Sequence, residues 1–140
     1  MSAIVIDASV AVKWFLPEPQ AHAARRVLKG RRSLLAPDLI WAEVGNVLWK
    51  RCRRAELTHE VAQRILRDFK RFPLETYAAK TLLEPAWVLA TQHRISVYDG
   101  LYLALAISRN CKLVTADHSL VDAIKKEPLG SVVVGVEHIR

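Results

Sequence analysis

The sequence predicts an α/β fold, with three layers (α/β/α) around a central, mainly parallel sheet of about five strands. Short apolar segments of strand length recur along the chain, as at 3–6 and 112–115. Segments with helical apolar spacing separate them, and strands that alternate with helices form parallel sheets with right-handed crossovers. The length of 140 residues suits a single domain, 1–140, with a buried core.

The first strand is predicted at 3–6, because a continuous apolar run is typical of a strand buried on both faces. A short helix at 9–16 ends before Pro17. Apolar spacing, caps and breakers predict the remaining elements: helix 20–29, strand 33–36, helix 38–54, helix 58–71, strand 74–77, helix 78–93, helix 99–108, strand 112–115, helix 120–126 and strand 131–136.

The composition indicates an anionic partner. Lys and Arg number 21 against 14 Asp and Glu, a net charge of +7. The electric field of a protein with this positive charge favours binding of nucleic acid or of an acidic protein segment. The two cysteines, Cys52 and Cys111, are interpreted as reduced thiols. No secretory signal or membrane-spanning run is visible, so we expect a cytoplasmic protein that does not enter a membrane.

Acidic residues are predicted to gather at one edge of this sheet. Asp7 ends the first strand, Asp117 follows the strand at 112–115, and Asp99 opens a helix. Glu43 lies roughly a turn and a half into the helix after the second strand. Strand ends and the starts of the following helices share an edge in parallel α/β sheets, where ligands bind at the reversal of strand order. If the first strand and the strand at 112–115 are neighbours, Asp7 and Asp117 face each other there.

Carboxylates in one cleft need a cation. Two unit charges about 4 Å apart repel by about 4 kcal/mol at an effective dielectric near 20. Oxygen ligands suit Mg²⁺ or Mn²⁺, which can activate water and stabilise charge on a phosphoryl group. An acidic metal cleft on a basic protein is the combination expected of a nuclease.

Each acid also has a plain structural interpretation. Asp117 can be a helix N-cap, and Asp99 is favoured in a first helical turn by the helix dipole. Asp7 can be a turn residue, and Glu43 a solvated position beside an apolar stripe. The functional prediction depends on their convergence, because these separate interpretations do not predict one shared edge.

Four motifs occur in order along the chain: Val5-Ile6-Asp7-Ala8-Ser9, Ala42-Glu43-Val44-Gly45-Asn46, Tyr98-Asp99-Gly100-Leu101-Tyr102-Leu103-Ala104-Leu105-Ala106 and Leu113-Val114-Thr115-Ala116-Asp117. Together they resemble the PIN-domain ribonucleases, and within them the VapC toxins of type II toxin–antitoxin systems. The resemblance covers nearly the whole chain and implies a PIN-like fold.

The resemblance implies metal-dependent hydrolysis of RNA phosphodiesters. The family's acidic ligands for one or two Mg²⁺ or Mn²⁺ ions fall on Asp7, Glu43, Asp99 and Asp117, with Glu43 as a ligand or water-positioner. Ser9 and Thr115 match the hydroxyl residues near the cluster, and are alternatively turn residues that bind the backbone. Asn46 matches the amide expected to orient Glu43 or a water on the metal. Many relatives carry a further acid where this chain has His118 and Ser119, so a fifth acidic ligand is not expected.

The resemblance also implies partners. These are an RNA (tRNA, rRNA or mRNA), a VapB-like antitoxin whose C-terminal segment covers the cleft, and a second copy in a homodimer. The helices at about 38–72 would form part of the antitoxin groove, where Trp41 and Trp49 either line it or pack in the core. Basic residues that could contact RNA, rather than merely face solvent, are Arg25, Arg26, Arg51 and Arg54.

Other functions remain open at this point. One is a PIN-domain nuclease of RNA processing without an antitoxin, which the absence of a neighbouring antitoxin gene would indicate. Another is a catalytically silent RNA-binding module, for which four acids would be an unnecessary electrostatic cost. Phosphoryl transfer through an aspartyl intermediate usually needs a second acid two residues after the first, where this chain has Ser9. No GxGxxG follows the first strand, and the histidines lack zinc-ligand spacing.

Overall fold

The central sheet has five strands, all parallel. In the computed structural model, which describes residues 2–139, they are β1 (Ala3–Ile6), β2 (Ser33–Pro37), β3 (Leu74–Tyr77), β4 (Lys112–Thr115) and β5 (Val133–Gly135). Their order is β3-β2-β1-β4-β5. The prediction of an α/β fold with a parallel sheet of about five strands is confirmed.

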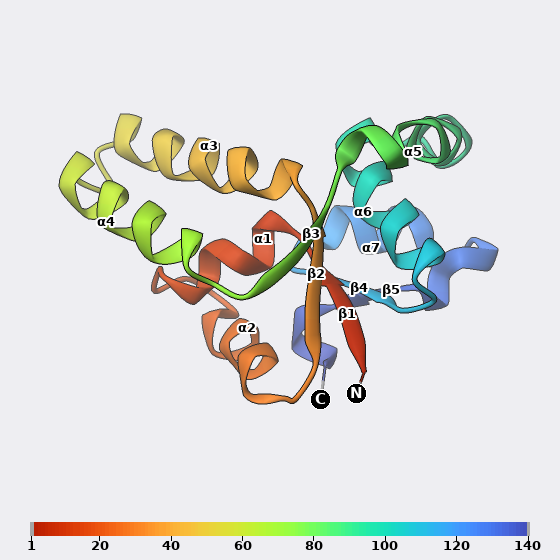
Figure 1. The fold of residues 1–140 in the computed structure, drawn as a ribbon, viewed down its shortest axis with the longest axis horizontal. Coiled ribbons are helices and arrows are strands. Elements are labelled where there is room, and N and C mark those ends of the chain that lie inside the picture. Colours follow the sequence, from red (N-terminus) through yellow and green to blue (C-terminus); the bar gives the residue numbers. More distant parts are fainter. Residues whose placement is uncertain (1, 140) are drawn as a thin grey trace.

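Strand β1 lies at the centre, where the order of the strands reverses. Val5 is in register with Leu35 of β2 on one side and with Leu113 of β4 on the other. The condition under which Asp7 and Asp117 face each other is therefore met. Figure 1 shows both chain ends near the amino ends of the strands, so the opposite, carboxyl edge is where the strands turn into helices.

Seven α-helices and four short 3₁₀ segments of the described chain surround the sheet. The helices are α1 (Ala8–Ala11), α2 (Ala21–Arg26), α3 (Leu39–Arg53), α4 (His59–Lys70), α5 (Ala79–His93), α6 (Val97–Ser108) and α7 (His118–Ile124). The 3₁₀ segments are Val12–Trp14, Val27–Lys29, Pro128–Ser131 and Val136–His138. Helices α3 and α4 project together to one side of the sheet, on the left of Figure 1. None of the helices in residues 2–139 has the length and apolar character needed to cross a bilayer.

Two helices begin two residues earlier than their apolar spacing predicts. Helix α6 begins at Val97, because the Ser96 hydroxyl caps it by accepting a hydrogen bond from the backbone N–H of Asp99 at 3.0 Å. Asp99 is thus the third residue of this helix, not its first. Helix α7 begins at His118, and Asp117 is its N-cap.

Strand β5 is shorter than predicted. It covers three residues rather than the six of 131–136, since 3₁₀ segments flank it on both sides. It pairs only with β4 and forms the edge of the sheet.

Helices α5 and α6 pack against each other at a glycine. A Cβ atom placed on Gly100 would lie 2.5 Å from the backbone oxygen of Ala86 in α5. Only a residue without a side chain allows this approach. Gly100 follows Asp99 directly, so this contact also sets the position of one of the acids.

Candidate active site

Asp7 is the buried acid at the centre of the carboxyl edge. It follows β1 directly and caps α1, with its side chain accepting a hydrogen bond from the backbone N–H of Val10 at 3.3 Å. Its exposed fraction is 6%. A carboxylate so buried requires hydrogen-bond donors, because an unpaired buried charge is very costly.

Two hydroxyl groups supply these donors. Ser9 Oγ donates to Asp7 Oδ1 and Thr115 Oγ1 donates to Asp7 Oδ2, each at 2.5 Å. The same oxygens accept backbone N–H groups after β4, Ser9 Oγ from Ala116 and Thr115 Oγ1 from Asp117, both at 3.0 Å. Each hydroxyl therefore both holds the carboxylate and shapes the turn, so the two alternative roles of Ser9 and Thr115 coexist.

Burial decides the ionisation of Asp7. Removal from water raises its pKa from 3.8 to about 6, despite the hydrogen bonds from Ser9, Thr115 and Val10, which favour the charged form. The negative charge of Asp99 raises the pKa slightly further. In the absence of a cation, the charged form of Asp7 is thus destabilised in the folded protein.

Asp117 faces the same edge from the end of β4. Its Oδ1 accepts hydrogen bonds from the backbone N–H of Ser119 at 3.0 Å and from the Ser119 hydroxyl at 2.6 Å. Within residues 2–139 no hydrogen bond reaches Oδ2. Ser119 therefore holds one oxygen of Asp117 and leaves the other available.

Glu43 is held by Tyr102, a motif residue with no predicted role at the site. The hydroxyl of Tyr102 in α6 donates to Glu43 Oε1 at 2.5 Å. Tyr102 is 2% exposed, and burial together with the charge of Glu43 raises its pKa, so it remains a protonated donor. Its position three residues after Asp99 was a usable signal, since residues three apart share a helix face.

Tyr102→Phe is expected to weaken the response to Mg²⁺ without unfolding the protein. The substitution keeps the buried ring and removes only the donor to Glu43, and loss of such an outer partner typically costs about 10- to 100-fold in metal affinity or activity. The Mg²⁺ concentration for half-maximal protection against thermal unfolding measures the effect. Tyr77→Phe, which removes a hydroxyl bound to exposed Glu75, is the control. Equal Mg²⁺ responses in the two variants would contradict the role of Tyr102.

Asp99 connects the other acids electrostatically. Burial, followed by the charges of Asp117 and Glu43, raises its pKa, and a hydrogen bond from Ser96 opposes the rise. Burial likewise raises the pKa of Glu43, against the hydrogen bond from Tyr102. Asp99 therefore interacts with each of the other three acids, because its charge also acts on Asp7.

The donor set suits a hard divalent cation, although its side chains do not form a closed shell. Among residues 2–139, no three Asp, Glu, His or Cys side chains are close enough to hold one ion as they stand. Mutual repulsion opposes closer approach of like charges. The chemistry nevertheless fits, since all four groups are carboxylates and both Glu43 Oε2 and Asp117 Oδ2 lack hydrogen bonds within the described chain.

Asn46 shares the exposed side of α3 with Glu43 but makes no hydrogen bond with it. No side-chain hydrogen bond of Asn46 occurs in residues 2–139. The expected orienting contact is made by Tyr102 instead. The amide is thus available for a group outside the chain.

The candidate RNA-binding arginines do not form one surface. Arg51 donates to the half-buried Glu18 and lies 3.9 Å from Glu56, so two carboxylates engage its guanidinium. Arg25 and Arg26 are exposed on α2, which leads into the start of β2, away from the carboxyl edge (Figure 1). Arg54 follows the far end of α3.

The two tryptophans of α3 differ in environment. Trp41 packs on Phe69 of α4 with ring centroids 4.9 Å apart and borders a hollow of about 270 Å³ with Lys70. Trp49 is 50% exposed and lies beside His59 and the guanidinium of Arg53. Trp41 therefore joins the packing between α3 and α4, whereas Trp49 faces outward.

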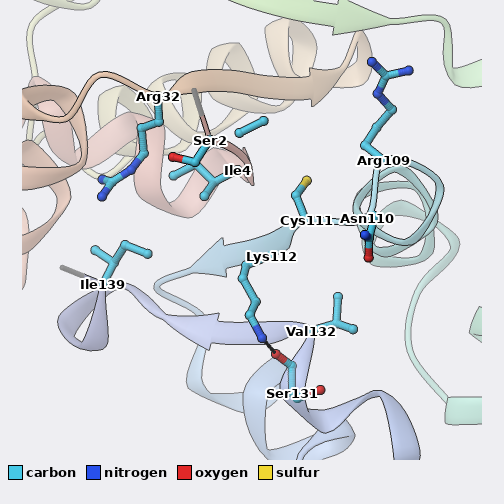
Figure 2. A pocket seen from close by; sticks show the side chains of 11 residues that line it. Ser2, Ile4, Arg32, Arg109, Asn110, Cys111, Lys112, Ser131, Val132 and Ile139 are labelled. Carbon is cyan, nitrogen blue, oxygen red and sulfur yellow. Dashed lines mark hydrogen bonds between the residues drawn. The ribbon is translucent and has the colours of Figure 1, made fainter.

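A larger cavity lies at the opposite edge of the sheet. It has a volume of about 700 Å³ and is lined by residues at the starts of β1, β4 and β5, with Arg32, Arg109 and Lys112 among them. Lys112 donates to the backbone oxygen of Ser131, and Arg109 packs on the ring of Tyr77. Figure 2 shows the guanidinium groups of Arg32 and Arg109 at opposite margins, directed apart. Its cations therefore do not converge on a common ligand position.

Comparison with known sequences matches most of the chain to a single protein family. Residues 4–126 match the family model of the PIN domain. Ribonuclease VapC3 of Pyrobaculum aerophilum is 35% identical over 123 residues, covering 85% of this chain and 92% of the relative. Ribonuclease VapC9 of Mycobacterium tuberculosis is 34% identical over 119 residues, covering 85% and 89%.

Solved structures show the same fold. A crystal structure from Pyrobaculum aerophilum has a TM-score of 0.71 at 24% identity, covering 97% of this chain and 92% of that chain. VapBC2 from Rickettsia felis, bound to a DNA fragment from its promoter, has a TM-score of 0.64 at 16% identity, covering 95% and 98%. A toxin–antitoxin complex from Klebsiella pneumoniae reaches 0.63 at 17% identity, covering 97% and 99%.

Proposed function

Because the chain belongs to the PIN-domain family, with VapC ribonucleases among its relatives, we propose that it is a metal-dependent endoribonuclease and the toxin of a VapBC-type toxin–antitoxin system. The observation that carries this proposal is the set of hydrogen bonds at the carboxyl edge, in which hydroxyl groups hold Asp7, Asp117 and Glu43 in place. The carboxylates repel one another at this edge, and a bound divalent cation would remove that repulsion. The rest of the protein is basic, with a net charge of +7 for the whole chain.

Asp7, Glu43, Asp99 and Asp117 would hold Mg²⁺ or Mn²⁺, with Glu43 as a ligand or as the group that positions water. When bound, the ion would supply charge stabilisation for a phosphodiester under attack by water. Ser9 and Thr115 keep both oxygens of Asp7 in place, Ser119 orients Asp117, and Tyr102 orients Glu43. These contacts orient the carboxylates before the substrate arrives.

The substrate proposed is cellular RNA (a tRNA, an rRNA or an mRNA), and the place of action is the cytoplasm. Arg54 and the exposed cations of α3 and α4 are the basic groups on the side of the molecule that carries Glu43. Arg25, Arg26 and Arg51 remain candidates for contacts with RNA that extends further round the protein, although Arg51 would have to leave Glu18.

The partner proposed is a VapB-like antitoxin that occupies the groove beside α3 and α4. This groove offers the hollow bordered by Trp41 and Lys70, together with the exposed ring of Trp49. A homodimer stays a prediction. Its most suitable surface is the outer side of α5 and α6, where four large apolar side chains are 42–62% exposed: Leu83, Trp87, Val88 and Ile107.

Expression of the chain alone is expected to arrest bacterial growth, and Asp99→Ala is expected to relieve the arrest by removing the acid that interacts with all the others. Sequencing of RNA 5′ ends from both cultures would identify the cleavage site. Equal toxicity of both forms at equal protein levels would exclude a catalytic cause. Cleavage by the wild-type protein without growth arrest would instead favour a PIN nuclease of RNA processing.

A further inference from the structure

A small hollow adjoins the acidic residues, between α3 and the first turn of α6. Its volume is about 250 Å³, and its walls are Ala42, Glu43, Asn46 and Tyr98. Pockets for whole drug-sized ligands have roughly 300 to 1,000 Å³. The hollow therefore suits a single planar ring system rather than a large ligand.

Two of the groups in its walls have no partner in the described chain. The side chain of Tyr98 is 59% exposed, and neither its hydroxyl nor the amide of Asn46 makes a hydrogen bond within residues 2–139. The other two tyrosines differ, since Tyr77 and Tyr102 each donate to a carboxylate. The aromatic face and the amide are thus available to a ligand.

The position of Tyr98 is fixed rather than incidental. It is the second residue of α6, whose start is set by the Ser96 cap, and its neighbour in sequence is Asp99. On the opposite wall, Asn46 lies one helical turn from Glu43. The hollow is therefore bounded by residues adjacent to two of the four acids, on two helices.

We propose that this hollow binds one unpaired base of the RNA substrate, stacked on Tyr98 with its edge hydrogen-bonded to Asn46. This inference rests on the proposed ribonuclease function, because it places the base beside the phosphodiester at the acids. Proteins recognise single-stranded RNA by splaying out bases, stacking them on aromatic rings and binding their edges. The substrate is thus a single-stranded segment or loop.

The amide further indicates which base is preferred. Asparagine presents one donor and one acceptor side by side, which match the N6 amino group and N7 of adenine. A peptide side chain could also enter an aromatic and polar hollow. RNA is favoured because Glu43 is itself a wall of the hollow, so a phosphodiester held at the acids has a flanking base within reach of Tyr98.

The test measures RNA binding separately from cleavage. Fluorescence anisotropy would follow labelled hexa-adenylate and hexa-uridylate binding to Asp7→Asn protein in Mg²⁺, as single-stranded probes that this variant does not cut. Adding Tyr98→Ala should weaken binding by about 5- to 150-fold, the range for loss of one base–aromatic stack. Tyr98→Phe should retain the affinity and Tyr98→Leu should not. Asn46→Ala should abolish any preference for hexa-adenylate while leaving binding of hexa-uridylate unchanged.

Three outcomes would overturn the proposal: unchanged affinity in Tyr98→Ala, full affinity in Tyr98→Leu, or weakened binding of an antitoxin peptide in Tyr98→Ala with RNA binding unchanged. Thermal unfolding of each variant would verify that the fold is intact. The wild-type protein, assayed separately for cleavage, tests the proposed function. If the wild-type protein cleaves RNA, but adding Tyr98→Ala to the Asp7→Asn protein leaves its RNA affinity unchanged, only the proposed base-binding site is contradicted. If it cleaves no RNA while binding depends on Tyr98, only the nuclease assignment fails.

Discussion

Asp7→Asn is expected to abolish Mg²⁺-dependent RNA cleavage and, in the absence of metal, to stabilise the protein. Cleavage should fall by more than about 100-fold, since loss of even an outer partner of a metal ligand typically costs about 10- to 100-fold. Stability should rise because asparagine carries no charge to bury. Its amide can keep the hydrogen-bond network, as the Thr115 hydroxyl can turn toward Ser9 Oγ, 3.3 Å away.

The stabilisation depends on pH with a definite sign. The pKa of Asp7 is raised from 3.8 in the unfolded chain to about 6 in the folded protein. Below pH 3.8 the group is protonated in both states and imposes no penalty. Between pH 3.8 and about 6 the unfolded chain gives up the proton that the folded state retains, so stability falls by about 3 kcal/mol and levels off above about 6. In a chelator, wild-type protein should lose this stability between about pH 4 and pH 6, and Asp7→Asn should not.

Urea unfolding of both proteins across this pH range, with a chelator present, measures the difference. Asp122→Asn is a matched control, because it makes the same change on an exposed part of α7 beside Lys125. This control should keep both the cleavage activity and the pH dependence of the wild type. Full cleavage activity in Asp7→Asn would remove Asp7 from the set of metal ligands, and parallel stability curves would contradict its raised pKa.

Gly100→Ala is expected to destabilise the protein by about 3 kcal/mol, the upper end for overpacking. The added Cβ would lie 2.5 Å from the backbone oxygen of Ala86, and a backbone cannot move aside as a flexible side chain can. Helix α6 must shift against α5, and Asp99 shifts with it. Urea unfolding would measure the loss, and cleavage activity should fall as well.

Gly45→Ala provides a control on α3 with the same chemical change. A Cβ there would meet only Leu66 Cδ2, at an ordinary 3.8 Å. Alanine is favoured over glycine within a helix by about 0.5 to 1 kcal/mol, so this variant should be slightly more stable than the wild type. Equal stabilities of the two variants would show that the α5–α6 contact does not require glycine.

The shared edge of the acids could be predicted from the sequence because it follows from local signals. Apolar runs identify strands, alternation with helices makes the sheet parallel, and a parallel sheet brings strand ends together. Only the adjacency of β1 and β4 had to be assumed for Asp7 and Asp117 to face each other. The structure shows this pairing of β1 with β4.

Helix starts were predicted less well, for a physical reason. Apolar spacing marks where a helix begins to face the core, whereas the cap marks where its hydrogen bonds begin. Ser96 and Asp117 are residues of cap-forming type, and each stands ahead of the first predicted helical residue. As N-caps, these two residues place both helix starts at the observed positions.

Long-range side-chain pairs could not be predicted. Tyr102 fits an apolar stripe, and its partner Glu43 lies 59 residues earlier, so no local pattern links them. Arg51 likewise belongs to a basic run in the sequence, while its ion pair is with Glu18, 33 residues away. A run of basic residues predicts that the protein binds an anionic partner, but it does not predict which carboxylate a given arginine contacts.

The hydrogen bond between Asp7 and Thr115 spans 108 residues of sequence. Ribosomes deliver Thr115 108 residues after Asp7, and β4 cannot pair with β1 until it has emerged. During synthesis, Asp7 therefore lacks Thr115, one of its two hydroxyl donors, and Asp117 is absent altogether. A product terminated before residue 112 would lack β4, the Thr115 donor and Asp117, so the proposed acidic site could not form in it.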